Sequence, residues 1–145
     1  MIQIYSDGSC KNTTTKEGGW AYIVILSNGE ELDDCGYCEE TTNNRMEMMA
    51  VIEGLKSVYH IKEPKTVISD SKYVVDGATS WMPQWKKDGW GRKRGRKVMN
   101  LDLWQELDSL IDGVVFKWVR GHDGNKYNEM CDMMASVTIE NYSLV

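Results

Sequence analysis

The chain has 145 residues, of which 41% are hydrophobic and 27% are charged, and its formal net charge is −5. This length fits one globular domain with a sizeable core and leaves no room for a second domain of ordinary size. No apolar run approaches membrane-spanning length, and the first residues lack the basic and apolar regions of a signal peptide. We therefore expect one domain over residues 1–145 in a soluble, cytoplasmic protein with no membrane partner.

The cysteines do not predict a metal site. Only one pair has C-x-x-C spacing, a structural zinc site needs a second pair of ligands, and the two histidines lie far apart in sequence. In an extended segment the paired cysteines would also point to opposite faces. We expect reduced thiols at Cys10, Cys35, Cys38 and Cys131.

The first forty residues contain three runs of alternating apolar and polar side chains. Residues 1–7 and 20–27 alternate, and residues 30–40 follow the pair Asn28-Gly29. Such alternation is typical of strands, and an Asn-Gly pair between two runs predicts a hairpin. The three runs therefore predict an antiparallel meander.

A helix is predicted over residues 44–60. Its apolar residues recur every three or four positions, at 48, 51, 52, 55, 58 and 59, which places them on one stripe. Asn44 suits an N-cap, and Glu47 follows it at the spacing of a capping box. Taken alone, Glu47 is therefore interpreted as a capping residue in the first turn.

The second half of the chain alternates strands with helices. Residues 66–69 form a short buried strand that ends at Asp70, and the intervening helix implies that this strand runs parallel to the first. The later predicted elements are a helix capped by Ser71 that runs to about Thr79, a helix over 100–112, a strand over 114–119, a loop over 120–125 and a helix over 127–139. This order predicts an α/β fold with a mixed five-stranded sheet, three strands antiparallel and two parallel.

Residues 86–97 form a strongly basic segment in an otherwise acidic chain. They contain seven lysine or arginine residues and one aspartate, Asp88, and three tryptophans lie within or just before them: Trp81, Trp85 and Trp90. Cations with flat aromatic faces are typical of a nucleic-acid groove. A solvated run of charges is the alternative interpretation, and the tryptophans weigh against it.

Four carboxylates occupy comparable positions in the predicted topology. Asp7 ends the first strand, Asp70 ends the fourth, Glu47 opens the helix between them, and Asp132 lies beside the apolar stripe of the last helix. Parallel neighbouring strands place both aspartates at one edge of the sheet, where sites in α/β proteins collect. Clustered carboxylates need a cation, and hard oxygen ligands suit Mg²⁺ or Mn²⁺. Each residue alone fits a blander role: a strand-end turn former for the two aspartates, and a solvated helix residue for Asp132.

Six motifs, in this order, resemble type 1 ribonuclease H over nearly the whole chain. They are Ser6-Asp7-Gly8-Ser9-Cys10, Thr41 to Glu47, Ser69-Asp70-Ser71-Lys72-Tyr73-Val74, Trp85 to Trp90, Leu101-Asp102-Leu103-Trp104, and Gly121-His122 with Asn128 to Asp132. The resemblance implies a ribonuclease H-like fold, with helices on both faces of the sheet and a basic handle that protrudes. The residues that resemble this handle are Trp81, Trp85, Lys86, Lys87 and Trp90. The resemblance further implies a monomeric endonuclease that cuts the RNA strand of RNA/DNA hybrids by two-metal-ion hydrolysis, leaving 3′-hydroxyl and 5′-phosphate ends.

The resemblance also assigns roles to individual residues. Asp7, Glu47, Asp70 and Asp132 match the carboxylates that bind the two Mg²⁺ or Mn²⁺ ions, and His122 matches a histidine that assists proton transfer or product release. Lys72 stands where many relatives carry a glutamine that contacts bases, and Asn12 lies in a loop that departs from the usual Gly/Pro-rich sequence. The implied substrate contacts are Cys10, Asn12, Thr42, Asn43, Asn44, Lys72, Trp81, Trp85, Lys86, Lys87, Trp90 and Asn100, whereas Trp104 is interpreted as core.

Two rival functions remain at this stage. One is a hybrid-binding module that has lost catalysis, which the complete acid set disfavours. The other is a phosphoacceptor signalling domain, which also places an aspartate and Mg²⁺ at strand ends. Such a domain needs an acidic neighbour near the first aspartate, whereas Asp7 has none.

Overall fold

The protein is organised around one sheet of five strands, in the order β3-β2-β1-β4-β5. The computed structural model describes residues 1–11, 16–91, 97–121 and 124–143. β1 pairs antiparallel with β2 and parallel with β4, β2 pairs antiparallel with β3, and β4 pairs parallel with β5. The strands are β1 (Ile2–Cys10), β2 (Gly18–Ile25), β3 (Glu31–Cys38), β4 (Lys65–Ser69) and β5 (Val114–Trp118).

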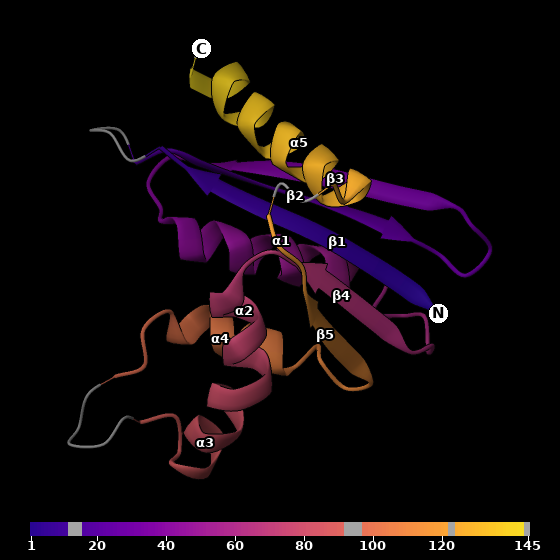
Figure 1. Ribbon diagram of the computed structural model, residues 1–145. Coiled ribbons are helices and arrows are strands. Elements are labelled where there is room, and N and C mark those ends of the chain that lie inside the picture. Colours follow the sequence, from indigo (N-terminus) through magenta and orange to yellow (C-terminus); the bar gives the residue numbers. More distant parts are fainter. Residues whose placement is uncertain (12–15, 92–96, 122–123, 144–145) are drawn as a thin grey trace.

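Helices lie on both faces of this sheet (Figure 1). α5 crosses β1, β2 and β3 on one face, and α1 packs against β1 and β2 on the other. The remaining helical segments gather beyond β4 and β5, on the side of α1. The helices are α1 (Asn43–Ser57), α2 (Lys72–Asp76), the π-helical segment η1 (Gly77–Trp81), α3 (Met82–Lys87), α4 (Leu101–Asp108) and α5 (Lys126–Ser143).

The alternation of β1 divides the core into two layers. Ile2 and Ile4 are buried against the α1 stripe, whereas Tyr5 packs with Ala135 and other residues of the α5 side. Because successive side chains of a strand point to opposite faces, a single strand supplies both layers. The same alternation sends Asp7 to the face of Tyr5, toward α5.

The predicted fold class is confirmed: the sheet is mixed, with the expected strand pairing and with helices on both faces. Trp104 is fully buried, as expected of a core residue. The strand predicted to end at Asp7 continues to Cys10, because residues 7–10 pair only with β2. Among the described helices, none combines the length and apolar character needed to cross a lipid bilayer.

The predicted N-cap of the first helix was wrong. Thr42, and not Asn44, caps α1: its backbone is extended and its side chain accepts a hydrogen bond from the Arg45 amide at 3.2 Å. α1 therefore begins at Asn43, and Glu47 lies in the second turn, where it cannot form a capping box. Glu47 is therefore not a capping residue of α1. Ser71 does cap α2, by accepting from the Val74 amide.

Candidate active site

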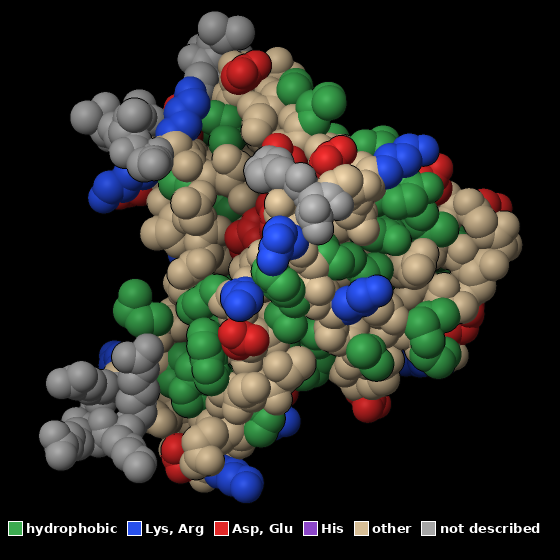
Figure 2. Space-filling view, in the orientation of Figure 1, with side chains coloured by type: hydrophobic (Ala, Val, Ile, Leu, Met, Phe, Trp, Pro, Cys, Tyr) green, Lys and Arg blue, Asp and Glu red, His purple; other side chains and the backbone are tan. Residues whose placement is uncertain are grey.

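Asp7, Glu47 and Asp70 meet at one end of the sheet, with one carboxylate oxygen from each within 4.8 Å of the others. The parallel register of β1 and β4 explains the meeting of the two aspartates. Ser6 pairs with Ser69, so Asp7 and Asp70 are the next residues on neighbouring strands. In Figure 2, acidic side chains are recessed on this face of the molecule, with lysine and arginine side chains around them.

The raised pKa values of this cluster show that its charges are crowded. Burial, followed by the charges of Asp70 and Asp132, raises the pKa of Asp7 to about 7, although a hydrogen bond with Glu47 lowers it. Burial and the two aspartates also raise the pKa of Glu47 well above its usual value, against the lowering effect of the Gly8 amide. Like charges in a site that excludes water disfavour ionisation. The described residues that shift these two pKa values include no positively charged side chain.

A divalent cation would supply that charge. The donors are carboxylate oxygens from three separate elements, and hard cations such as Mg²⁺ and Mn²⁺ prefer such ligands. The three side chains are close enough to share one ion or a bridged pair. The residues therefore fit a divalent metal site, to which Asp7, Glu47 and Asp70 would contribute the ligands.

Asp132 approaches the cluster from α5. It lies outside the close triplet, but its charge reaches Asp7 and raises the pKa of that carboxyl. Asn128, one turn earlier, fixes this end of α5: its side-chain amide donates to the carbonyls of Ser6 at 3.4 Å and Ile68 at 3.3 Å. Asn128 belongs to one of the family motifs found in the sequence, but no role was predicted for it. Its buried contacts join the helix to both aspartate-bearing strands.

The end of β5 lies beside Asp70. The indole Nε1 of Trp118 donates to the Asp70 carbonyl at 3.0 Å, and Lys72 Nζ lies 4.9 Å from the centroid of the Trp118 ring. Gly121 packs on the carboxylate, since a Cβ there would lie 2.9 Å from Asp70 Oδ2. The sequence analysis predicted no functional role for Trp118 or Gly121. His122, the next residue, lies outside the described residues.

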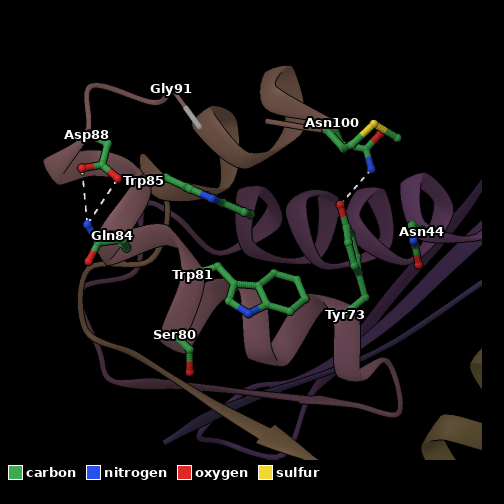
Figure 3. Close-up of a pocket in the computed structure, with 10 residues that line it drawn as sticks. Asn44, Tyr73, Ser80, Trp81, Gln84, Trp85, Asp88, Gly91 and Asn100 are labelled. Atoms are coloured by element: carbon green, nitrogen blue, oxygen red, sulfur yellow. Dashed lines mark hydrogen bonds between the residues drawn. The ribbon is translucent and has the colours of Figure 1, made fainter. Parts of the chain in front are cut away.

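A groove of about 680 Å³ opens between α1, α2, α3 and the start of α4 (Figure 3). Trp81, Trp85, Asn44 and Asn100, all predicted substrate contacts, line it. Tyr73, which had no predicted role, also lines it and packs its ring 5.6 Å from that of Trp81. Trp81 is partly exposed, so the groove offers an aromatic face to a ligand.

The N-terminus of α1 connects the groove to the other side of the site. Arg45 donates two hydrogen bonds to the Asp102 carboxylate, at 3.0 and 2.8 Å, and one to Asn100 Oδ1 at 3.3 Å. Asn100 has a left-handed backbone and donates to the Tyr73 hydroxyl at 2.9 Å. Thr42 and Asn43 are exposed beside this network. Arg45 therefore joins Thr42 to Asn100, two of the predicted substrate contacts.

Cys10 lies on the far side of the α1 N-terminus. Its thiol is within 3.4 Å of the Thr41 carbonyl oxygen, and burial raises the thiol pKa. With Lys11, Lys16 and Arg45 it lines a second groove, of about 600 Å³. Of the predicted contacts here, Asn12 lies outside the described residues.

The two lysines predicted for the handle differ. Lys86 forms an ion pair with Asp108 at 3.1 Å, on α4, and lines a small surface pocket apart from the aromatic groove. Lys87 is exposed at the end of α3. Trp90 is partly buried against the core, and its amide donates to the Trp85 carbonyl at 2.6 Å. Residues 92–96, with all three arginines of the basic segment, lie outside the described residues.

Known proteins are similar to this chain in fold and in sequence. A family model described as RNase H matches residues 1–140. The chain is 42% identical to the ribonuclease H of Cyanothece sp. over 137 residues, covering 93% of this chain and 87% of that protein. The solved structure of LC9-RNase H1 is 33% identical to this chain and superposes with a TM-score of 0.84. The match covers 97% of this chain and 72% of the LC9-RNase H1 chain. LC11-RNase H1 is 17% identical over 99% of both chains, with a TM-score of 0.75.

The mixed sheet with its clustered carboxylates thus defines a nuclease with the ribonuclease H fold. The family match covers almost the whole chain, and the Cyanothece relative supports it at the level of sequence. The chain belongs to the ribonuclease H family of hydrolases.

Proposed function

We propose that the protein is an endoribonuclease that hydrolyses the RNA strand of RNA/DNA hybrids and leaves 3′-hydroxyl and 5′-phosphate ends. The observation that carries the proposal is the meeting of Asp7, Glu47 and Asp70 at the end of the sheet, with an aromatic groove nearby. LC11-RNase H1, which shares the fold, was solved in complex with an RNA/DNA hybrid. We extend that substrate to this chain.

The carboxylates would hold two divalent ions, Mg²⁺ or Mn²⁺. Such ions, when bound, supply the Lewis acidity that activates water and neutralises charge on the leaving oxygen. Asp7, Glu47 and Asp70 would be their ligands, and Asp132 would add negative charge from α5. Hydrolysis of this kind needs no covalent nucleophile. We retain His122 as a proposed aid to proton transfer or product release.

Two grooves on either side of the α1 N-terminus would receive the two strands. The groove with Trp81, Trp85 and Asn100 offers aromatic faces and an amide to the DNA strand, which we propose follows the handle past Lys87. Cys10, Asn43 and Asn44 lie where the minor groove would pass. A hybrid presents 2′-hydroxyls in a wide, shallow groove, so selectivity would come from polar contacts there.

The test compares the wild type with Asp70→Asn on matched RNA/DNA hybrid, double-stranded RNA and double-stranded DNA. We expect metal-dependent cleavage of the hybrid alone. Asp70→Asn should lose about 10³-fold or more in turnover, which corresponds to about 4 kcal/mol of transition-state stabilisation, while hybrid binding persists. Asp76→Asn is the matched control, because this aspartate is exposed on α2. Unchanged turnover in Asp70→Asn would disprove the proposed site.

Hybrid binding without cleavage is the alternative that this experiment separates. A wild type that binds the hybrid in Mg²⁺ or Mn²⁺ but leaves the RNA strand intact would be a binding module. The pKa values of Asp7 and Glu47 argue for catalysis, because crowding carboxylates has an energetic cost that a binding surface does not need.

A further inference from the structure

Trp118 makes two different contacts beside the acidic cluster. Its indole Nε1 donates to the carbonyl oxygen of Asp70 at 3.0 Å, and its ring carries the ammonium of Lys72 at 4.9 Å from the centroid. The side chain is 39% exposed, although it belongs to a strand that lies next to the core.

We propose that Trp118 is a positioning residue that fixes Asp70 in the cluster and holds Lys72 beside it, so that Lys72 contacts a phosphate of the RNA strand. This inference rests on the proposed hydrolysis of hybrids. In this proposal Trp118 contacts neither the metal nor the substrate phosphate. It acts through Asp70, which would bind the metal, and through Lys72, which would contact the phosphate.

The backbone carbonyl of Asp70 is one of the two groups that Trp118 contacts. The regular pairing of β4 and β5 ends with the Val119 amide, which donates to the Ser69 carbonyl at 2.9 Å. The next carbonyl, that of Asp70, lies beyond this ladder and accepts a hydrogen bond from the indole N–H of Trp118 at 3.0 Å. The Trp118 side chain thus adds a contact between β5 and the residue that follows β4.

The orientation of the Asp70 carboxylate follows from that fixed backbone. On the other side of Asp70, the Ser71 amide donates to Ser69 Oγ at 3.0 Å, and Gly121 packs against Oδ2. Metal-binding carboxylates work only when neighbouring contacts hold them in place. Loss of the indole donor would release one of the contacts that hold the Asp70 backbone, and so loosen one metal ligand.

Lys72 is the second group that Trp118 contacts. Lys72 lies two residues after Asp70, and its side chain is exposed. Its ammonium lies over the indole face of Trp118, and the ring attracts a cation in that position. The contact restricts a long, flexible side chain to the neighbourhood of the carboxylates. The substrate phosphate closest to such a cation belongs to the strand that is cut, because Asp70 acts on that strand.

Separate substitutions test the contact of Trp118 with Asp70 and the role of Lys72. Trp118→Phe removes the N–H but keeps a ring for Lys72, and Lys72→Met removes the charge but keeps the aliphatic stem. Lys62→Met is the matched control, because Lys62 lies over Tyr59 at 5.0 Å in the same kind of contact, beyond the other end of α1. Mg²⁺ and Mn²⁺ affinity is measured by calorimetry without substrate, and kcat and KM are measured at saturating metal.

We expect Trp118→Phe to weaken metal affinity about tenfold, with KM for the hybrid unchanged once the metal saturates. Lys72→Met should leave metal affinity unchanged, raise KM and reduce the slope of affinity against salt by about one charge. Lys62→Met should change none of these. Unchanged metal affinity in Trp118→Phe would overturn the proposal, as would a uniform fall in kcat, affinity and metal-free stability, which would show a merely structural role.

Trp118→Tyr, which also lacks the indole N–H, provides a second variant if the phenylalanine substitution does not fold. Failure of both variants to fold without metal would make Trp118 a core residue and overturn the proposal. A wild type that binds metal but does not cut hybrids would instead reject the proposed function. The calorimetric comparison of wild type and Trp118→Phe then still decides whether the indole positions Asp70.

Discussion

The amide N–H of Gly8 donates a hydrogen bond to the carboxylate of Glu47, and this contact joins β1 to the second turn of α1. The helix comes this close only because residue 8 has no side chain. A Cβ there would lie 2.3 Å from the Met46 carbonyl carbon and 2.4 Å from the Glu47 amide nitrogen. Both atoms belong to the backbone, so neither can turn away.

Gly8→Ala should therefore push α1 away from β1 and separate Glu47 from the two aspartates. We expect a loss of about 1–3 kcal/mol in the free energy of unfolding, as for other overpacked sites. Cleavage should fall about 10²-fold or more, because a small misplacement of catalytic groups is costly. Urea denaturation and hybrid cleavage measure the two effects. Gly29→Ala is the control: its turn has open space, so only backbone strain is added and cleavage should persist.

The raised pKa of Asp7 predicts how stability depends on pH in the absence of metal. Its pKa is about 7 in the folded protein against an ordinary value of 3.8, so the folded state binds more protons between these values. The free energy of unfolding should then fall as pH rises through this window, and the penalty should be fully present above about pH 7. Asp7→Asn cannot ionise, so it should be more stable than the wild type at about pH 8 and lose that advantage near pH 4.

Urea denaturation in the presence of a chelator checks this prediction at both pH values. The exposed Asp76→Asn is again the control and should show no such crossover. Added Mg²⁺ should raise the thermal midpoint of the wild type at about pH 8 more than that of Asp7→Asn, since cation binding relieves the same repulsion. A variant that is less stable than the wild type at pH 8 would contradict the electrostatic account of the cluster.

The sequence predicted the acidic cluster because simple topology determines it. A strand, a helix and a second strand imply a parallel pair, and parallel neighbours bring the residues after Ser6 and Ser69 to one edge. The approach of Glu47 was harder to predict. It depends on which of several capping residues starts α1, and Thr41-Thr42-Asn43-Asn44 offers four in a row. The structure has Thr42 as the cap, and the Thr41 amide before it donates to the Lys16 carbonyl at 3.0 Å, a contact that local sequence does not record.

The contacts that support the cluster could not be predicted from local patterns. Trp118 meets Asp70 and Asn128 meets Ser6 across long stretches of chain, through single hydrogen bonds with no sequence periodicity. The π-helical segment η1 was missed for a similar reason. At Gly77 the helix passes so close to the Trp104 ring that a Cβ would lie 2.0 Å from it. Such fits depend on where two distant elements pack.

The contacts of Arg45 predict an effect on hybrid affinity that is separate from catalysis. Its side chain donates one hydrogen bond to Asn100 Oδ1 and two to the Asp102 carboxylate. These contacts with Arg45 lower the pKa of the Asp102 carboxyl. Arg45→Met should release Asn100 and weaken hybrid binding about fivefold to tenfold, with kcat at saturation unchanged. Stability should change by less than about 1 kcal/mol, because the pair is partly exposed. Lys56→Met removes a charge from the other end of α1 and should not weaken binding; equal weakening would show a general charge effect.

The ion pair between Lys86 and Asp108 predicts that the two adjacent lysines of α3 act differently on the hybrid. Lys87→Ala should lower hybrid affinity and reduce the slope of log affinity against log salt by about one, because an exposed cation facing a phosphate releases about one counterion. Lys86→Ala should change that slope much less, since Asp108 already neutralises its charge at 3.1 Å. Binding titrations at several salt concentrations measure both slopes. Asp108→Asn frees Lys86 and should steepen the slope, whereas equal slopes for both lysine variants would mean that the ion pair opens when the hybrid binds.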